Sequence, residues 1–124
     1  MNVLVVANDL SWQVTELVLC LNTMGHGTVF VMDTEEAIVS VHVGNPQPQV
    51  VVAYSEDLDV AKLVKKVREH DIFMPIVILA WPWERINGLP EWINVVEMDE
   101  NHMDYVAIVA KISGVFQAKS LRHE

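Results

Sequence analysis

Five short aliphatic runs, separated by segments with helical periodicity, constrain this chain more than any other feature of its sequence. The runs are Val3–Val6, Thr28–Met32, Val50–Ala53, Ile76–Leu79 and Ile93–Val96. A continuous aliphatic run is typical of a strand that is buried on both faces, as in a parallel sheet covered by helices. Strands that alternate with helices form right-handed crossover units. The pattern therefore predicts an α/β fold, a doubly wound five-stranded parallel sheet in the order 2-1-3-4-5.

The segments between the runs carry helix signals. Asp33 and Glu36 have the spacing of a capping box, and Gly25 is a natural helix stop. Helices are expected over 11–24, from 33 to the stop at 44, over 58–70, and from 103 to about 119. The segment Trp81–Trp92 breaks this rhythm, because Pro82 and Pro90 leave room for only one or two helical turns. We therefore expect a degenerate fourth helix in a three-layer sandwich.

Length and charge exclude several classes of protein. The 124 residues predict one domain over 1–124, and the net charge of −9 disfavours binding to nucleic acid or to anionic membranes. No apolar run approaches the roughly 20 residues of a membrane span, and the N-terminus lacks the basic region of a secretory signal. The single cysteine, Cys20, excludes an intramolecular disulfide. These features predict a cytoplasmic protein.

The layout resembles the phosphorylation-receiver domains of response regulators. Three segments carry the likeness: 25–29 resembles the receiver pattern GH-x-V, 35–37 resembles EAL, and 48–52 resembles the approach to PDLVLLD. In receivers, two acids after the first strand hold Mg²⁺ and an aspartate after the third strand accepts the phosphoryl group. A Ser or Thr follows the fourth strand, and a Lys follows the fifth. The resemblance implies this fold and these positions for chemistry.

The residues at those positions do not carry receiver chemistry. Ala7 and Asn8 stand where the acidic pair is expected, and Tyr54 takes the place of the phosphate-accepting aspartate. Ala80 replaces the hydroxyl residue, and Met98 marks the place of the lysine. A hard divalent cation needs converging oxygen ligands, which an alanine does not supply. The sequence therefore predicts a receiver scaffold without phosphotransfer.

A second, narrower resemblance lies in the C-terminal third. The segment 98–107 is similar to the stretch that closes the N-terminal wing domain of the bacterial ornithine, lysine and arginine decarboxylases, and 74–79 is similar to a strand of that domain. Such wings are degenerate receiver-like modules that serve in oligomer assembly, while a separate domain holds pyridoxal phosphate. This resemblance implies a non-catalytic module that works in oligomerisation.

The chain departs from the wing pattern at several places. Asn101 and His102 replace the family's second acid and its threonine, and Ile108-Val109 replaces a Gly-Arg pair. The sequence contains no Ser-x-His-Lys, so a Schiff-base lysine of that family's type is absent, and it stops at Glu124 before the segment that leads into the catalytic domain. We expect no enzymatic activity, no catalytic residues and no cofactor.

Aromatic and aliphatic side chains supply candidates for an interface. Trp81 and Trp83 lie in the irregular segment, and the last helix presents apolar residues on more than one face. The interface candidates are Trp81, Trp83, Ile108, Val109 and Ile112. Exposed aromatic side chains are enriched at interface hot spots, although tryptophans here could also cover the core where a full helix is missing. Trp92 is expected in the core.

Acidic residues near the fifth strand raise the question of a metal site. Glu97, Asp99, Glu100 and Asp104 cluster in sequence, but helix capping and a solvated edge explain them better, and we expect no metal. The leading hypothesis is a protein–protein interaction or oligomerisation module, with a protein partner or a homo-oligomer. Alternatives are a freestanding pseudo-receiver in signalling, and a small ligand-binding protein that uses the carboxyl edge of the sheet.

Overall fold

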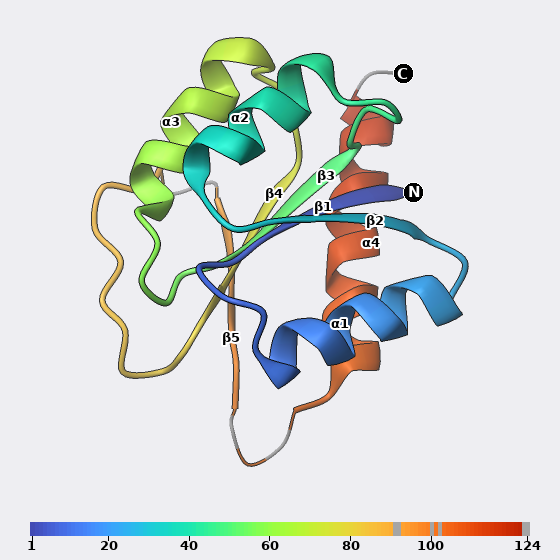
Figure 1. Ribbon diagram of the computed structural model, residues 1–124, viewed down its shortest axis with the longest axis vertical. Coiled ribbons are helices and arrows are strands. Elements are labelled where there is room, and N and C mark those ends of the chain that lie inside the picture. The colour runs from blue at the N-terminus through green and yellow to red at the C-terminus, as the bar shows by residue number, and fades with distance from the viewer. Residues whose placement is uncertain (91–92, 100, 102, 123–124) are drawn as a thin grey trace.

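The computed structural model describes residues 1–90, 93–99, 101 and 103–122, with side chains described as far as Ala118 (Figure 1). The strands are β1 (Asn2–Val6), β2 (Gly27–Val31), β3 (Val50–Tyr54), β4 (Ile76–Ala80) and β5 (Asn94–Glu97). The helices are α1 (Trp12–Thr23), α2 (Thr34–Val43), α3 (Val60–His70) and α4 (Tyr105–Arg122). Element order follows the sequence prediction, with bounds that shift by up to three residues.

The five strands form one parallel sheet in the order β2-β1-β3-β4-β5, which confirms the predicted topology. In register, Val5 of β1 lies between Phe30 of β2 and Val52 of β3. At the other side of the sheet, Ala80 of β4 pairs with Glu97 of β5. All strands run in the same direction, so their carboxyl ends meet at one edge, where open α/β sheets place their ligands.

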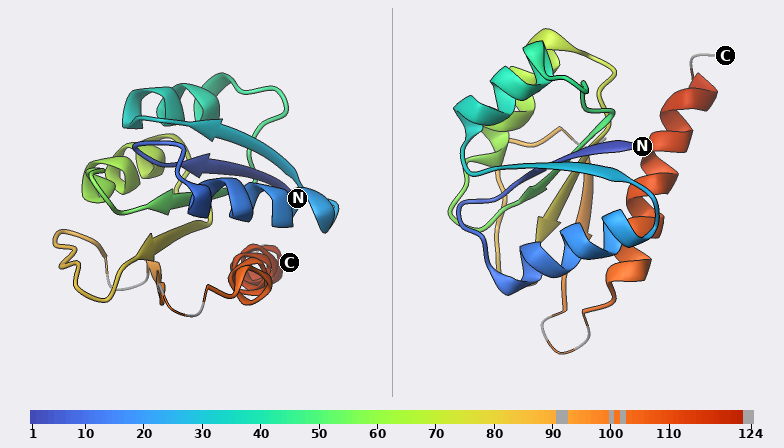
Figure 2. Two further views of the ribbon diagram at one scale, coloured as in Figure 1. Left: turned by 60° about the horizontal axis from the view of Figure 1, so that its bottom comes forward. Right: turned by 45° about the vertical axis from the view of Figure 1, so that its right-hand side comes forward.

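Helices cover both faces of the sheet (Figures 1 and 2). On one face, α1 and α4 enclose a core that includes Leu17, Val52 and Ile112. On the other face, α2 and α3 enclose a second core that includes Leu63 and Ile78. The aliphatic runs of β1, β3 and β4 supply side chains to both cores, which is why these strands carry no polar alternation.

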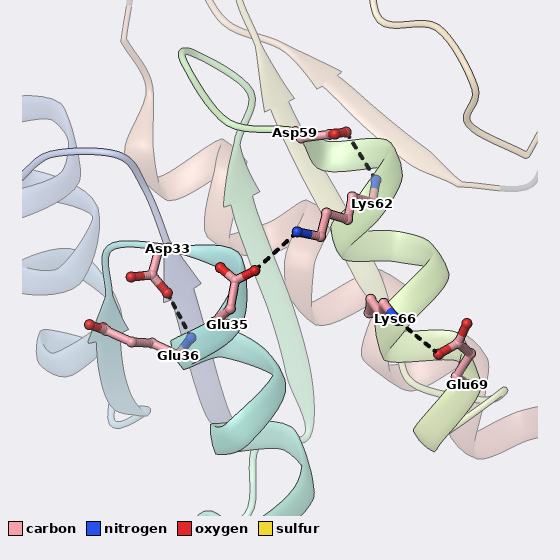
Figure 3. A network of polar contacts seen from close by, with 7 residues as sticks. All are labelled: Asp33, Glu35, Glu36, Asp59, Lys62, Lys66 and Glu69. Atoms are coloured by element: carbon pink, nitrogen blue, oxygen red, sulfur yellow. Dashed lines mark hydrogen bonds and ion pairs between the residues drawn. The ribbon is translucent and has the colours of Figure 1, made fainter.

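Side-chain caps fix where α2 and α3 begin (Figure 3). The Asp33 carboxylate accepts a hydrogen bond from the Glu36 backbone N–H at 2.7 Å, and the Asp59 carboxylate accepts one from the Lys62 N–H at 3.1 Å. The Lys62 ammonium also contacts the Glu35 carboxylate at 3.0 Å and lowers the pKa of that carboxyl. The starts of the two neighbouring helices are thereby held together at the carboxyl edge.

The connection from β4 to β5 contains no helix within its described residues, 81–90 and 93. Ile86 and Leu89 from this connection pack against the core on the α2 and α3 side. Gly88 has a φ of +81°, and a Cβ at this position would lie 3.3 Å from the Ala61 Cβ, so glycine allows the loop to approach α3. Apolar side chains of this loop therefore cover part of the core that a helix between β4 and β5 would cover.

None of the helices in the described ranges is both long and apolar enough to span a membrane.

Candidate functional site

The carboxyl edge of the sheet brings together the positions at which the sequence departs from the receiver pattern. Ala7 follows β1, Tyr54 ends β3, Ala80 ends β4 and Met98 follows β5, and all four side chains are buried. Asn8 is exposed. Ala7, Tyr54 and Met98 belong to the same apolar cluster. These four buried positions thus offer no carboxylate oxygen to a cation.

Tyr54 is the largest of these side chains and closes the end of β3. Its hydroxyl donates to the backbone carbonyl of Gln13 at 3.3 Å, which connects β3 to the first turn of α1. Burial raises the pKa of the Tyr54 phenol above its ordinary value, and the nearby Tyr105 raises it further. The phenol therefore stays neutral and presents no anionic oxygen at this edge.

Beside Tyr54, Trp81 is held by a polar network. The Trp81 indole Nε1–H donates to the Glu56 carboxylate at 2.9 Å, and the Trp81 backbone N–H donates to the Glu84 carboxylate at 2.9 Å. The same Glu84 oxygen accepts from the hydroxyl of the buried Ser55 at 2.6 Å. These bonds join the β3–α3 loop to the β4–β5 connection, so the Trp81 ring has a fixed position.

Trp83 lies on the outer side of Trp81. The two rings are stacked, with centroids 5.3 Å apart and planes that differ by 3°. Trp81 is 8% exposed, whereas Trp83 is 63% exposed. The Trp83 ring therefore exposes a large aromatic surface to solvent. The Trp81 ring on which it stacks is held by hydrogen bonds and by packing.

The structure corrects four of the five predicted interface residues. Trp81, Ile108, Val109 and Ile112 are buried within the chain itself, because the inner side of α4 packs on the sheet and Trp81 closes the same core. Only Trp83 remains on the surface. The prediction for Trp92 falls outside the described residues.

Other apolar side chains are exposed at the same edge. Leu10 and Trp12 follow β1 and are 62% and 61% exposed. Trp12 is the first residue of α1, so it lies at the carboxyl edge of the sheet. The carboxyl edge thus has buried apolar side chains beneath it and exposed apolar side chains on its surface.

Acidic residues near β5 were considered for a metal site. Among the residues that the structure describes, no group of three His, Cys, Asp or Glu side chains is placed to hold a metal ion. Asp99 and Asp104 each accept a backbone hydrogen bond, from Asn101 and Ala107 respectively. Glu100 lies outside the described residues.

Sequence reasoning missed Glu56 and Glu84. A buried indole N–H needs an acceptor, so a partner for Trp81 was to be expected. The acceptor could not be identified from the sequence, because Glu56 lies in a different loop, 25 residues away from Trp81.

Comparisons with known proteins agree on the fold. No protein-family model and no curated protein matches the sequence, but solved structures of receiver domains do. A response regulator receiver protein from Sinorhizobium medicae is 18% identical with a TM-score of 0.75, and the match covers 96% of each chain. A response regulator receiver domain protein from Clostridium thermocellum is 13% identical with a TM-score of 0.79 over 97% of each chain.

A Francisella response regulator receiver domain is 19% identical with a TM-score of 0.74, over 94% of this chain and 97% of the other. At these identities the likeness concerns the fold alone. It supports the receiver-like architecture and does not extend to the finer resemblance to decarboxylase wings.

Proposed function

We propose that this chain is a non-catalytic, receiver-like interaction module that works without phosphorylation. The observation that carries the proposal is the filled carboxyl edge, where Ala7, Tyr54, Ala80 and Met98 are buried in place of charged and hydroxyl groups. Desolvated apolar side chains offer nothing to a divalent cation or a phosphoryl group. What such an edge can do is bind another protein.

Trp83 is the residue that we assign to this contact. Its ring is exposed, but its position is set by the Trp81 ring on which it stacks and by the bonds from Trp81 to Glu56 and Glu84. A preorganised aromatic side chain loses little conformational entropy on binding, and tryptophan is enriched at interface hot spots. The buried ring thus serves as the support for the exposed one.

Intrinsic fluorescence tests the absence of phosphate chemistry, because Trp81 and Trp83 lie at the edge in question. Addition of beryllofluoride with Mg²⁺ should leave the tryptophan emission of the protein unchanged. Fluoride with Mg²⁺ alone is the matched control, and an ordinary phosphorylatable receiver domain shows that the reagent is active. A saturable emission change that needs beryllium and Mg²⁺ together would contradict the proposal.

A second candidate is assembly within a larger enzyme, as in the decarboxylase wings. Its support is the resemblance of the segments 74–79 and 98–107 to the wing, beside a β4–β5 connection that lacks a helix within its described residues. The natural reading frame beyond Glu124 separates the two candidates. A downstream domain with a pyridoxal phosphate lysine would favour the wing, and a stop codon would favour a freestanding module.

A further inference from the structure

A groove of about 790 Å³ opens at the opposite, amino edge of the sheet. It lies between the end of α3, the start of β4, the edge strand β5 and the second half of α4. Ile72 and Val95 contribute exposed apolar surface, at 67% and 49%. Arg68 and Lys111 also line the groove. The half-buried Arg68 guanidinium donates to the backbone carbonyls of Asp71 and Met74, and the acidic Asp71 caps the end of α3 beside it, so Lys111 supplies the more exposed charge. In a chain of net charge −9, we term this surface the cationic groove.

Acidic residues gather at the other edge. They follow the carboxyl ends of the strands or begin the helices, as Figure 3 shows for α2 and α3. Those from the loops after the strands include Asp9, Glu56, Asp57, Glu84 and Asp99, with the basic Arg85 in the loop of Trp83. Together with the exposed Leu10, Trp12 and Trp83, they form a surface that we term the tryptophan edge.

The helix dipoles account for part of this polarity. Acids are favoured at helix N-termini and bases near helix C-termini, so an all-parallel sheet tends to separate the two signs. The dipoles do not account for the apolar side chains, because Trp83 at one edge and Ile72 at the other are each more than half exposed. The two edges therefore complement each other in two independent respects. They carry opposite charges, and each exposes large apolar side chains.

We propose that the occupant of the cationic groove is the tryptophan edge of a second copy of this chain, in a head-to-tail contact. The inference rests on the proposed function, because it names the partner of Trp83. The ring would lie against Ile72 and Val95, with acidic neighbours facing Arg68 and Lys111. Opposite potentials favour this docking and set its direction.

A symmetric contact is disfavoured by the same charges. Two tryptophan edges face to face would bring together the acidic sides of two chains that already carry a net charge of −9 each. A contact between two different surfaces is heterologous, and it continues to rings or open chains instead of stopping at a dimer. Assembly beyond the dimer is thus the signature that separates the two geometries.

Sedimentation velocity over a concentration series tests the wild-type protein. The mean mass should rise past that of a dimer, and the apparent association should weaken as salt is raised, since charge pairs at the rim are screened. A protein that remains monomeric throughout would overturn the inference, as would a plateau at the dimer.

Complementary variants give the sharper test. Trp83→Ala removes the anchor and leaves the groove intact, whereas Ile72→Asp places a negative charge in the groove and leaves the anchor intact. Each variant alone should lose association by roughly thirtyfold or more. Because each retains one working surface, an equimolar mixture should form dimers of one variant with the other and nothing larger.

Two further variants guard the interpretation. Val43→Asp introduces the same charge at a residue of α2 that is 66% exposed, and it should assemble as the wild type does. Lys111→Glu is a second groove variant, for use if Ile72→Asp does not fold. A mixture that stays monomeric overturns the head-to-tail contact. If this occurs while beryllofluoride still has no effect, only the partner is wrong and the proposed function stands.

Discussion

The two edges of this sheet have opposite characters. At the carboxyl edge, Tyr54, Trp81 and Met98 close the ends of the strands, and hydrogen bonds to Glu56 and Glu84 tie the loops together. At the amino edge, β5 and the second half of α4 leave a groove open. Apolar side chains thus fill one edge of the sheet, whereas the other edge keeps an open groove beside a β4–β5 connection that has no helix within its described residues.

The largest expected effect comes from restoring an acid at the filled edge. Tyr54→Asp removes a buried aromatic ring and places a carboxylate among apolar neighbours. We expect the free energy of unfolding to fall by about 4 kcal/mol or more, since a cavity and a desolvated charge add. Chemical denaturation measures this. Tyr54→Phe is the matched control, and it should lose only about 1 kcal/mol with the bond to Gln13. A stable Tyr54→Asp protein would mean that this edge is open.

The stacked tryptophans offer a comparison within one edge. Trp81→Ala should lower the free energy of unfolding by about 3–5 kcal/mol, because its ring is buried and hydrogen-bonded. Trp83→Ala should lower it by about 1 kcal/mol, the order of a single aromatic stack. Equal losses in urea titrations of the two variants would make Trp83 part of the core and remove it as an anchor.

Alkaline pH sharpens the same contrast. The pKa of Tyr54 in the folded protein is raised by burial, so the unfolded chain releases this proton first. Its contribution to stability is complete below the unfolded value of about 10 and is lost as the pH rises above it, by up to about 1.4 kcal/mol per pH unit. Urea titrations of wild type and Tyr54→Phe at pH 8 and pH 11 isolate the effect. The fall should be smaller in Tyr54→Phe, and an identical fall in both proteins would count against a buried phenol.

The amino edge should show the smallest effect on folding. Ile72 is exposed, so Ile72→Asp should change the free energy of unfolding by no more than about 0.5 kcal/mol. Chemical denaturation of this variant is compared with that of Val43→Asp. A loss of several kcal/mol would show that Ile72 belongs to the packed structure and that the groove is less open than described.

The sequence was sufficient for the architecture, while the predicted absence of phosphotransfer stays a prediction. The aliphatic runs of β1, β3 and β4 indicated strands that are buried on both faces. Ala7 and Tyr54 could be aligned with positions at which receiver domains carry acidic side chains. It was not sufficient for the interface. Ile108, Val109 and Ile112 look alike on either side of a helix until the position of the sheet is known. Trp81 and Trp83 differ in burial although they are only two residues apart. This difference could not be predicted, because a loop has no periodicity that indicates which side chains point inward.

Mass spectrometry of the intact protein after incubation with acetyl phosphate and Mg²⁺ tests most directly whether this carboxyl edge is without phosphotransfer chemistry. We expect no acid-labile phosphoryl adduct, because Tyr54 supplies no acceptor carboxylate and Ala7 supplies no oxygen ligand for Mg²⁺. A Mg²⁺-dependent phosphoryl adduct on an aspartate at the carboxyl edge would contradict this expectation.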